Sequence, residues 1–407
     1  MAQHSTKKQA VFIFEAYRTP HGSNRVNGGL HALKPVHLLT RLIHRFRAED
    51  RFPLANLDAF YLGCTYPFDE QGGNMARTYA LFSGLPENCF ATQFSGDPTT
   101  GLQTLFYAAE AIQQGTIQRA LCCGLESNSR IKDTDKIGPI AFDPEMALRL
   151  AYVPPGISAD LLATKMGMTR SELDGYTFNS VSQAKTAIEN GRFDHRMIPI
   201  RDQNGLSILE KDEYQEQKLD LDWLQDQTPA YKAIGNEGFD ARALSKYPEL
   251  GRIFHVHTQA SRAGFADGAA LLGIGVQDAG THPPLAKLHG VSLIGGEPIL
   301  GPSNLIQAIE AVLQKTNLAS SAIDIWETDE KFAANALLVR KHFELDPEQH
   351  NTWGGDLAWG DSAAAAGPMM ICNALERLNS TKKKIALVAL SGLSGLAAAC
   401  IIERLEP

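Results

Sequence analysis

Hydrophobic runs alternate with amphipathic stretches in the first part of the chain. Short apolar runs bounded by turn residues predict buried strands at residues 10–16, 57–64 and 119–124. Apolar residues spaced three and four positions apart predict helices at residues 36–46, 74–83 and 99–114. Because strands and helices alternate in this way, we expect a mixed α/β sheet covered by helices.

The pattern loosens between residues 126 and 255, where helices are predicted only at 158–165 and 172–190. After Asp267 the alternation returns, with strands at 268–276, 286–294, 323–327, 384–391 and 396–404 and helices at 304–314, 331–342 and 362–378. The helix and strand at 98–126 resemble those at 362–393, which indicates an internal duplication. We therefore predict an N-terminal half at 1–125 (completed by about 250–275), an inserted loop domain at 126–249 and a C-terminal half at 276–407.

Composition narrows the class of protein. With 407 residues, 44% of them hydrophobic and 21% charged, the chain can bury a large core. A net charge of -8, with scattered Lys and Arg, argues against nucleic acid or a membrane as partner. No stretch approaches the roughly 18 apolar residues of a membrane-spanning helix and no leader is evident, so a cytoplasmic location is expected.

Neither cysteine nor histidine spacing predicts a metal site. The six cysteines show no paired spacing of the zinc or redox type and are interpreted as buried thiols. His255 and His257 flank Val256 and would point to one face of a strand, but no third ligand is evident. Hydrogen-bonded histidines are the simpler interpretation.

Several short motifs occur in a defined order along nearly the whole chain. They include Glu15-Ala-Tyr-Arg-Thr-Pro20, Gly73-Asn-Met-Ala-Arg77, Gly124-Leu-Glu-Ser-Asn-Ser-Arg130, Asp267-Gly-Ala-Ala270 and Glu330-Lys-Phe-Ala-Ala334. Their order and spacing resemble the thiolase family, acyl-CoA enzymes that cleave or join acyl chains through an acyl-cysteine. The resemblance implies two duplicated βαβ-rich halves in a five-layered α-β-α-β-α core with an inserted loop domain. It also implies a homo-oligomer, either a dimer or a tetramer, and a place in lipid metabolism.

The position of the family's nucleophile is unusual in this chain. In the family, a cysteine starts a buried helix whose dipole and backbone N–H groups lower the pKa of the thiol and stabilise the acyl intermediate. Counting along the motifs places Pro98 of Ser95-Gly-Asp-Pro-Thr-Thr-Gly101 in that position. Proline has neither a thiol nor a backbone N–H. Two other interpretations stay open: Asp97 and Pro98 simply start a helix, or a local gap places Ser95 in the nucleophile position.

Three further catalytic positions implied by the resemblance also differ. Asp361 stands where the family has the histidine base, Asp329 where it has the oxyanion-site asparagine, and Ser391 where it has a second cysteine. A carboxylate is a weaker base than histidine and repels an oxyanion, and a serine hydroxyl cannot replace a thiolate-like base. Asp361 equally fits a cap for the following helix. If Asp329 and Asp361 converge, one should have a raised pKa or a cation should lie between them.

The predicted ligand side is altered as well. Ala263 stands where the family has a serine that contacts the pantetheine arm, and Phe332 and Leu300 are the other candidate CoA contacts. No cofactor is expected beyond CoA or an acyl-CoA as a ligand. We expect acyl-cysteine thiolysis or Claisen condensation to be absent or very weak, which favours a ligand-binding homologue or a non-catalytic subunit of a second thiolase-like chain. The alternatives are retro-aldol or hydrolytic chemistry with Asp329, Asp361 and Ser391 as acid/base groups, and a residual acetyl-CoA C-acyltransferase.

Overall fold

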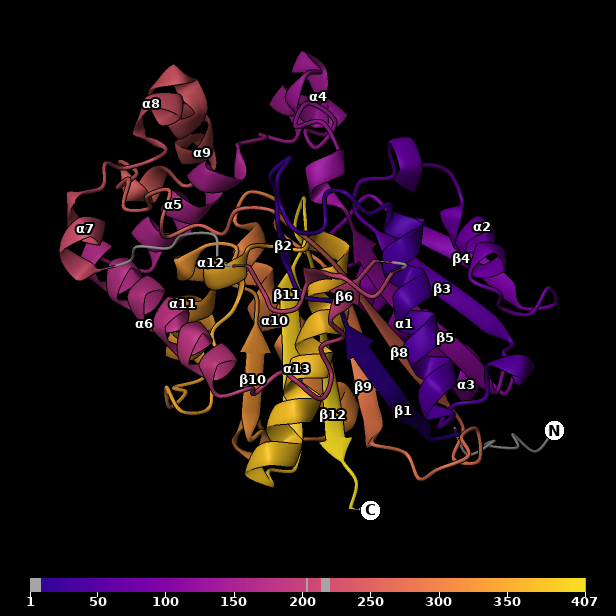
Figure 1. Cartoon of the computed structure of the whole chain (residues 1–407). Helices are drawn as coiled ribbons and strands as arrows, with labels where there is room; N and C mark the ends of the chain where they lie inside the picture. Colours follow the sequence, from indigo (N-terminus) through magenta and orange to yellow (C-terminus); the bar gives the residue numbers. More distant parts are fainter. Residues whose placement is uncertain (1–8, 203, 214–219, 407) are drawn as a thin grey trace, which may run out of the picture.

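The computed structural model describes residues 9–202, 204–213 and 220–406, and one large sheet organises them (Figure 1). Its ten strands follow the order β10-β11-β12-β9-β1-β8-β5-β3-β4, with β2 paired to β8 beside this path. The strands are β1 (Val11–Arg18), β2 (Gly22–Ser23), β3 (Ala59–Cys64), β4 (Phe90–Ser95), β5 (Arg119–Glu126), β8 (Ala266–Gly275), β9 (Ala286–Gly295), β10 (Ile325–Thr328), β11 (Ile385–Ser391) and β12 (Leu396–Arg404).

The sheet consists of two similar halves. In one half, β3 runs parallel to β5, β5 antiparallel to β8 and β8 antiparallel to β1. In the other, β10 runs parallel to β11, β11 antiparallel to β12 and β12 antiparallel to β9. The halves are joined where the first residues of β1 pair with β9. The predicted fold class, a duplicated mixed α/β fold, is therefore confirmed.

Helices cover both halves and fill the space between them. They are α1 (Pro35–Glu49), α2 (Met75–Phe82), α3 (Thr100–Gln113), α10 (Asn304–Thr316), α11 (Ala333–His342), α12 (Asp356–Trp359) and α13 (Ala366–Thr381). One hydrophobic cluster joins α3 and α13 to strands of both halves. Separate clusters pack α1 and α2 against the first half and α10 against the second. The five layers are thus α1 with α2, the first half of the sheet, α3 with α13, the second half of the sheet, and α10.

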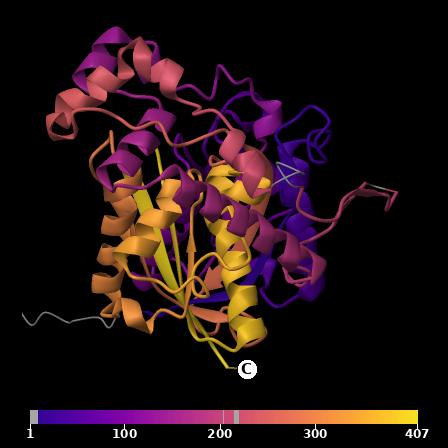
Figure 2. The ribbon, with the colours of Figure 1, turned by 90° about the vertical axis from the view of Figure 1, so that its left-hand side faces the viewer.

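The middle of the chain forms a helical region beside the strand ends. Its elements are α4 (Pro144–Arg149), α5 (Pro155–Lys165), α6 (Arg170–Glu189), β6 (Ile200–Arg201), β7 (Ser207–Leu209), α7 (Leu221–Asp226), α8 (Lys232–Ile234) and α9 (Asp240–Lys246). Figure 1 shows α4, α5, α8 and α9 toward the top of the view and α6 beside α11, and Figure 2 shows β6 and β7 extending away from the body. Helix α6 starts at a capping box in which Thr169 and Glu172 satisfy each other's backbone N–H groups.

Most predicted elements are present, but the patterns did not predict strand β4, the short strands β2, β6 and β7, or helices α4, α7, α8, α9 and α12. Strand β4 was missed because its sequence, Phe-Ala-Thr-Gln-Phe-Ser, contains no sustained apolar run. Helix α11 begins at Ala333 and α13 at Ala366, later than the patterns indicated, because the residues before them form extended or 3₁₀ backbone. In the described part of the chain, no helix is long and apolar enough to cross a membrane.

Candidate functional site

The predicted site residues gather where parallel strands of both halves end. Strand β3 runs parallel to both of its neighbours, β4 and β5, and β10 runs parallel to β11. The carboxyl ends of the strands in each group therefore lie at a common edge. Asp97 and Pro98 follow β4, Asp329 follows β10 and Ser391 ends β11. In α/β sheets, the carboxyl edge is where ligands generally bind. The loop after β11 joins the two edges, because the backbone N–H of Leu393 donates to the Asp97 carboxylate at 2.7 Å.

Pro98 is buried, and the adjacent Asp97 organises the turn around it. One Asp97 oxygen accepts from the backbone N–H of Thr99 at 2.7 Å and from its hydroxyl at 2.5 Å, and the other accepts from Leu393. The turn is tightly packed, since a Cβ on Gly392 would overlap the Asp97 carboxylate. Helix α3 begins at Thr100, two residues later than an N-cap at Asp97 implies, although the Asp97 carboxylate still satisfies an N–H group of the turn that leads into the helix.

Asp329 and Ser391 are in direct contact. The Ser391 backbone N–H and hydroxyl both donate to one Asp329 oxygen, at 2.5 and 2.6 Å. The same oxygen lies 3.1 Å from the Lys331 ammonium, and the other accepts from the Asn335 side chain at 2.9 Å. Lys331 also donates to the Ser391 carbonyl at 2.5 Å. Asp329 is fully buried, so these bonds satisfy a carboxylate that water cannot reach.

Asp361 is held beside residues 264–266 by its backbone. Its backbone N–H donates to Gly264 and its carbonyl accepts from Ala266. One side-chain oxygen accepts from the Ala363 N–H at 2.8 Å. Asp361 therefore caps the 3₁₀ turn that precedes α13, which agrees with its interpretation as a cap and leaves its second oxygen for other contacts.

Lys331 is the central charge of this site. Burial alone would lower the pKa of Lys331, but Asp329, Asp361 and Asp356 outweigh burial and hold it above its ordinary value. Burial raises the pKa of Asp361 and of Asp356, while Lys331 opposes both shifts. Lys331 is therefore paired directly with Asp329 and is near enough to Asp361 and Asp356 to oppose the rise of their pKa values.

None of the described cysteines has the environment of a reactive thiol. All six cysteines are buried, and burial raises the pKa of each, to about 11 for Cys89 and about 12 for Cys372 and Cys400. Cys64 lies near the predicted site, but its thiol is 3.7 Å from the Glu126 carboxylate, which disfavours a thiolate. Ser95 is exposed at the end of β4, and its hydroxyl accepts from Gln93.

Two of the three candidate CoA contacts lie together. The segment carrying Ala263 pairs with the segment carrying Phe332, because the Ala263 N–H donates to Lys331 and the Ala333 N–H donates to Ser261. Leu300 is elsewhere, 3% exposed in the hydrophobic cluster of α5 and α11. Ala263 and Phe332 are both partly exposed, so they line the approach to Lys331.

Tyr231 covers this approach. Its ring lies 6.1 Å from the Phe332 ring, and a Cβ on Gly156 would overlap it. Burial raises the pKa of Tyr231, opposed by the nearby Arg262. Arg262 itself pairs through its backbone with Phe332. An aromatic side chain from the inserted region therefore fills space directly over a predicted ligand contact.

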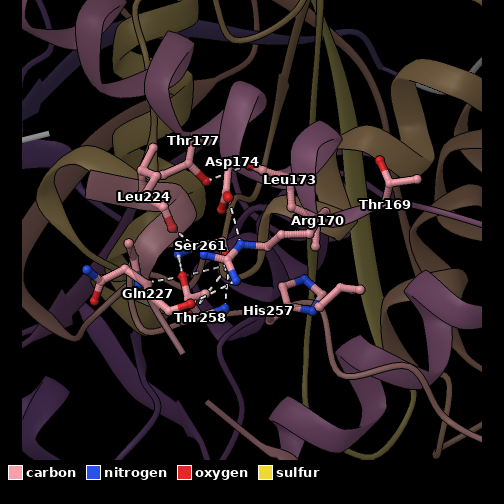
Figure 3. Close-up of polar contacts among 12 residues, drawn as sticks. Thr169, Arg170, Leu173, Asp174, Thr177, Leu224, Gln227, His257, Thr258 and Ser261 are labelled. Carbon is pink, nitrogen blue, oxygen red and sulfur yellow. Dashed lines mark hydrogen bonds and ion pairs between the residues drawn. The ribbon is translucent and has the colours of Figure 1, made fainter. Parts of the chain in front are cut away.

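Buried polar contacts hold the segment that leads to Tyr231 (Figure 3). Arg170 pairs with Asp174 at 2.6 Å and donates to the carbonyls of Leu224 and Gln227 at the end of α7. Tyr231 is the N-cap of α8, four residues after Gln227, and the N–H of Ala230 donates to the His257 carbonyl. These contacts hold the segment that precedes Tyr231.

His255 and His257 both bind one carboxylate. Their Nδ1 atoms lie 2.9 and 2.8 Å from Asp160, and Nε2 of His255 lies 2.9 Å from Asp240. Asp160 raises the pKa of His255 most strongly, and Asp240 adds to the effect. Within the described residues, no group of three metal-binding side chains converges. The pair is a hydrogen-bonded link between α5 and α9.

Comparison with known proteins agrees with this architecture. The thiolase N-terminal domain matches residues 11–237, and the thiolase C-terminal domain matches residues 282–404. The chain belongs to the thiolase family. Among its family relatives, a probable acetyl-CoA acyltransferase of Staphylococcus aureus (strain COL) is 27% identical over 413 residues, which cover 97% of this chain and 99% of the relative. A 3-ketoacyl-CoA thiolase of Bacillus subtilis (strain 168) is 25% identical over 414 residues, with the same coverage.

Solved thiolase structures share the fold. A Bacillus anthracis acetyl-CoA acetyltransferase superposes with a TM-score of 0.85 at 24% identity, covering 98% of this chain and 100% of that structure. Human mitochondrial 3-ketoacyl-CoA thiolase gives a TM-score of 0.83 at 23% identity, covering 98% and 99%. The predicted thiolase fold is therefore confirmed.

Sequence reasoning missed two residues of this thiolase-family site. Lys331 stood inside the Asp329-Glu-Lys-Phe332 motif, and a cation two residues from a predicted buried aspartate was a usable signal. Tyr231 carried no such signal, because its contact with Phe332 depends on how the inserted region folds back.

Proposed function

We propose that this chain is a thiolase-family protein related to acyl-CoA metabolism that does not perform acyl-cysteine chemistry. It serves as a ligand-binding homologue or as a non-catalytic subunit. The observation that carries the proposal is the Asp97 carboxylate beside Pro98. It accepts from the N–H groups of Thr99 and Leu393, which point into the site from the helix start and from the facing loop. An oxyanion needs such donors free, and a carboxylate in their place repels developing negative charge.

The state of the other catalytic positions supports the same conclusion. Asp329 accepts from Ser391, Asn335 and Lys331 and so has no free capacity as a base. Lys331 remains protonated at neutral pH because its pKa is raised, and a protonated amine cannot abstract a proton. The Ser391 hydroxyl donates a hydrogen bond to the Asp329 carboxylate, so it is already engaged. The groups at these positions satisfy one another.

The approach to the site fits CoA poorly. Tyr231 packs on Phe332 and on Gly156, and Ala263 has no hydroxyl to donate to a ligand. Tyr231 therefore occupies space beside Phe332, one of the candidate CoA contacts. We favour a ligand that reaches the site without passing Phe332, or a role that needs no small ligand.

The decisive assay gives the purified chain acetoacetyl-CoA and CoA, with the B. subtilis 3-ketoacyl-CoA thiolase as a parallel control. We expect no thiolysis above the rate without protein, and no acyl adduct by intact-protein mass spectrometry. Turnover with an acyl group on Ser95 or on any cysteine would refute the proposal. Calorimetric titration with CoA and co-purification with a second thiolase-like chain then separate a ligand-binding homologue from a subunit.

One observation favours carboxylate acid/base chemistry as a second candidate. Asp361 has a raised pKa and one side-chain oxygen that is not used by the Ala363 N–H. A carboxyl group whose pKa is raised keeps its proton to higher pH than an ordinary aspartate and can act as a general acid. If the chain cleaves a β-hydroxyacyl or ester substrate, the Asp361→Asn variant should lose that activity, whereas Ser95→Ala should keep it.

A further inference from the structure

A second polar groove lies between the C-terminal ends of α1 and α13. It encloses about 570 Å³, and none of its lining residues belongs to the site at the strand ends. Strand β1 forms its floor through Glu15 and Tyr17, and the exposed Lys382 lies at its rim. Figure 1 shows α1 and α13 on either side of β1. The volume is that of a small-molecule site.

Glu15 is an unsatisfied carboxyl group at the bottom of this groove. Its side chain is 1% exposed, and neither oxygen makes a hydrogen bond with any described residue. The β1–β8 register shifts between Ile13 and Glu15, and this irregularity in the strand precedes Glu15 directly. Burial and Glu49 raise the pKa of Glu15 to about 8, although Arg51 and Tyr17 oppose the shift. A buried carboxyl group without a partner is costly, so a ligand that donates hydrogen bonds here would bind favourably.

Unused donors face the same groove. Among the described residues, the Nε atoms of Arg51 and Arg196 are buried without a hydrogen bond. Arg51 is near enough to lower the pKa of Glu15, yet no ion pair within 4 Å joins them in the described chain. Arg196 is 3.6 Å from Glu376, too long for a hydrogen bond. The groove therefore separates an unmatched acceptor from unmatched donors.

We propose that this groove binds a small zwitterion, whose ammonium donates to Glu15 and whose anionic group accepts from Arg51 and Arg196. A simple cation would satisfy Glu15 but leave the Nε donors of Arg51 and Arg196 without hydrogen bonds. Arg196 would still keep its ion pair with Glu376. A simple anion would pair with the guanidinium groups but face Glu15 and Glu49. A molecule that carries both charges satisfies both ends. This site is independent of the function proposed above for the strand ends.

The test titrates the full chain by calorimetry with glycine, β-alanine and 4-aminobutyrate, in which one, two and three carbons separate the charges. Butylamine and butyrate each supply only one of the charges. We expect at least one zwitterion to bind, with about millimolar or better affinity, and both single-charge probes to bind at least about tenfold more weakly. Failure of all three zwitterions, or equal binding of butylamine or butyrate, would overturn the proposal.

Two variants assign the binding to these residues. At pH 9, where Glu15 is ionised, Glu15→Gln and Arg51→Gln should each weaken zwitterion binding by about tenfold or more, because each removes one charge-assisted contact. Glu87→Gln is the matched control, since Glu87 is exposed and outside the groove, and it should leave binding unchanged. Thermal unfolding of each variant verifies that it is folded. Unchanged binding in a folded Glu15→Gln protein would also overturn the proposal.

Discussion

Replacing Lys331 with methionine tests whether one internal cation holds the site together. The substitution keeps the length of the side chain but removes the ammonium that lies 3.1 Å from Asp329 and near Asp356 and Asp361. Breaking a buried ion pair typically costs about 3–5 kcal/mol, because one charge is left buried without a partner. Here we expect about 3 kcal/mol, since Asp329 keeps its hydrogen bonds from Ser391 and Asn335.

The loss should depend on pH in a defined direction. Without the cation, the buried carboxyl groups hold protons more tightly in the folded chain than in the unfolded chain. The folded state then binds more protons, so the stability of the variant falls as pH rises. We expect the difference between wild type and Lys331→Met to be largest near pH 8 and smaller near pH 5.

Urea unfolding followed by tryptophan fluorescence and circular dichroism measures this difference. Lys341→Met is the matched control: Lys341 lies on α11 and pairs with Glu172 at 2.7 Å, but both side chains are exposed to about 40%. That substitution should cost less than about 1 kcal/mol. Adding Asp329→Asn to Lys331→Met should recover part of the loss. A Lys331→Met loss below about 1 kcal/mol, or one equal at pH 5 and pH 8, would refute the reasoning.

Three other predictions follow from the geometry. Gly156→Ala should destabilise the chain by about 1–3 kcal/mol in thermal or urea unfolding, because its Cβ overlaps the Tyr231 ring, and Tyr231→Ala in the same chain should relieve the loss. His255 bridges Asp160 and Asp240 with a raised pKa, so its stabilisation is complete below its ordinary pKa and is lost as pH rises through the folded value. Proteolysis of the α9 region should quicken over that range, and His255→Gln should abolish this pH dependence. Ellman's reagent should label none of the six buried cysteines before unfolding and all six afterwards; a fast-reacting thiol in the native chain would contradict this.

The sequence was sufficient for the fold because its patterns are local. The helices after Thr99 and Asn304 have continuous apolar faces, and the runs ending in Glu126 and Ser391 read as buried strands. Strand β4 was not predicted because it lies at the edge of the sheet, where pairing with β3 places it and its own residues give no apolar run. Tertiary pairing overrides weak local preference in such strands.

The site was only partly predictable for a related reason. Motif spacing located Pro98, Asp329, Asp361 and Ser391, but it could not show what each group contacts. The role of Asp97 depends on Leu393, which is 296 positions away in the chain. Glu15 lay inside a quoted motif, yet only the fold shows that its carboxyl group is buried without a partner.

The predicted site residues are physically coupled through their hydrogen bonds. Without Asp97 and Asp329, the backbone N–H groups of Thr99, Leu393 and Ser391 would lose these acceptors. The Asp97 carboxylate accepts hydrogen bonds from the N–H groups of Thr99 and Leu393, and the Asp329 carboxylate accepts one from the N–H of Ser391. Two buried carboxylates in one site then need a cation, and Lys331 supplies it. The residues at these positions therefore satisfy one another's charges and hydrogen bonds.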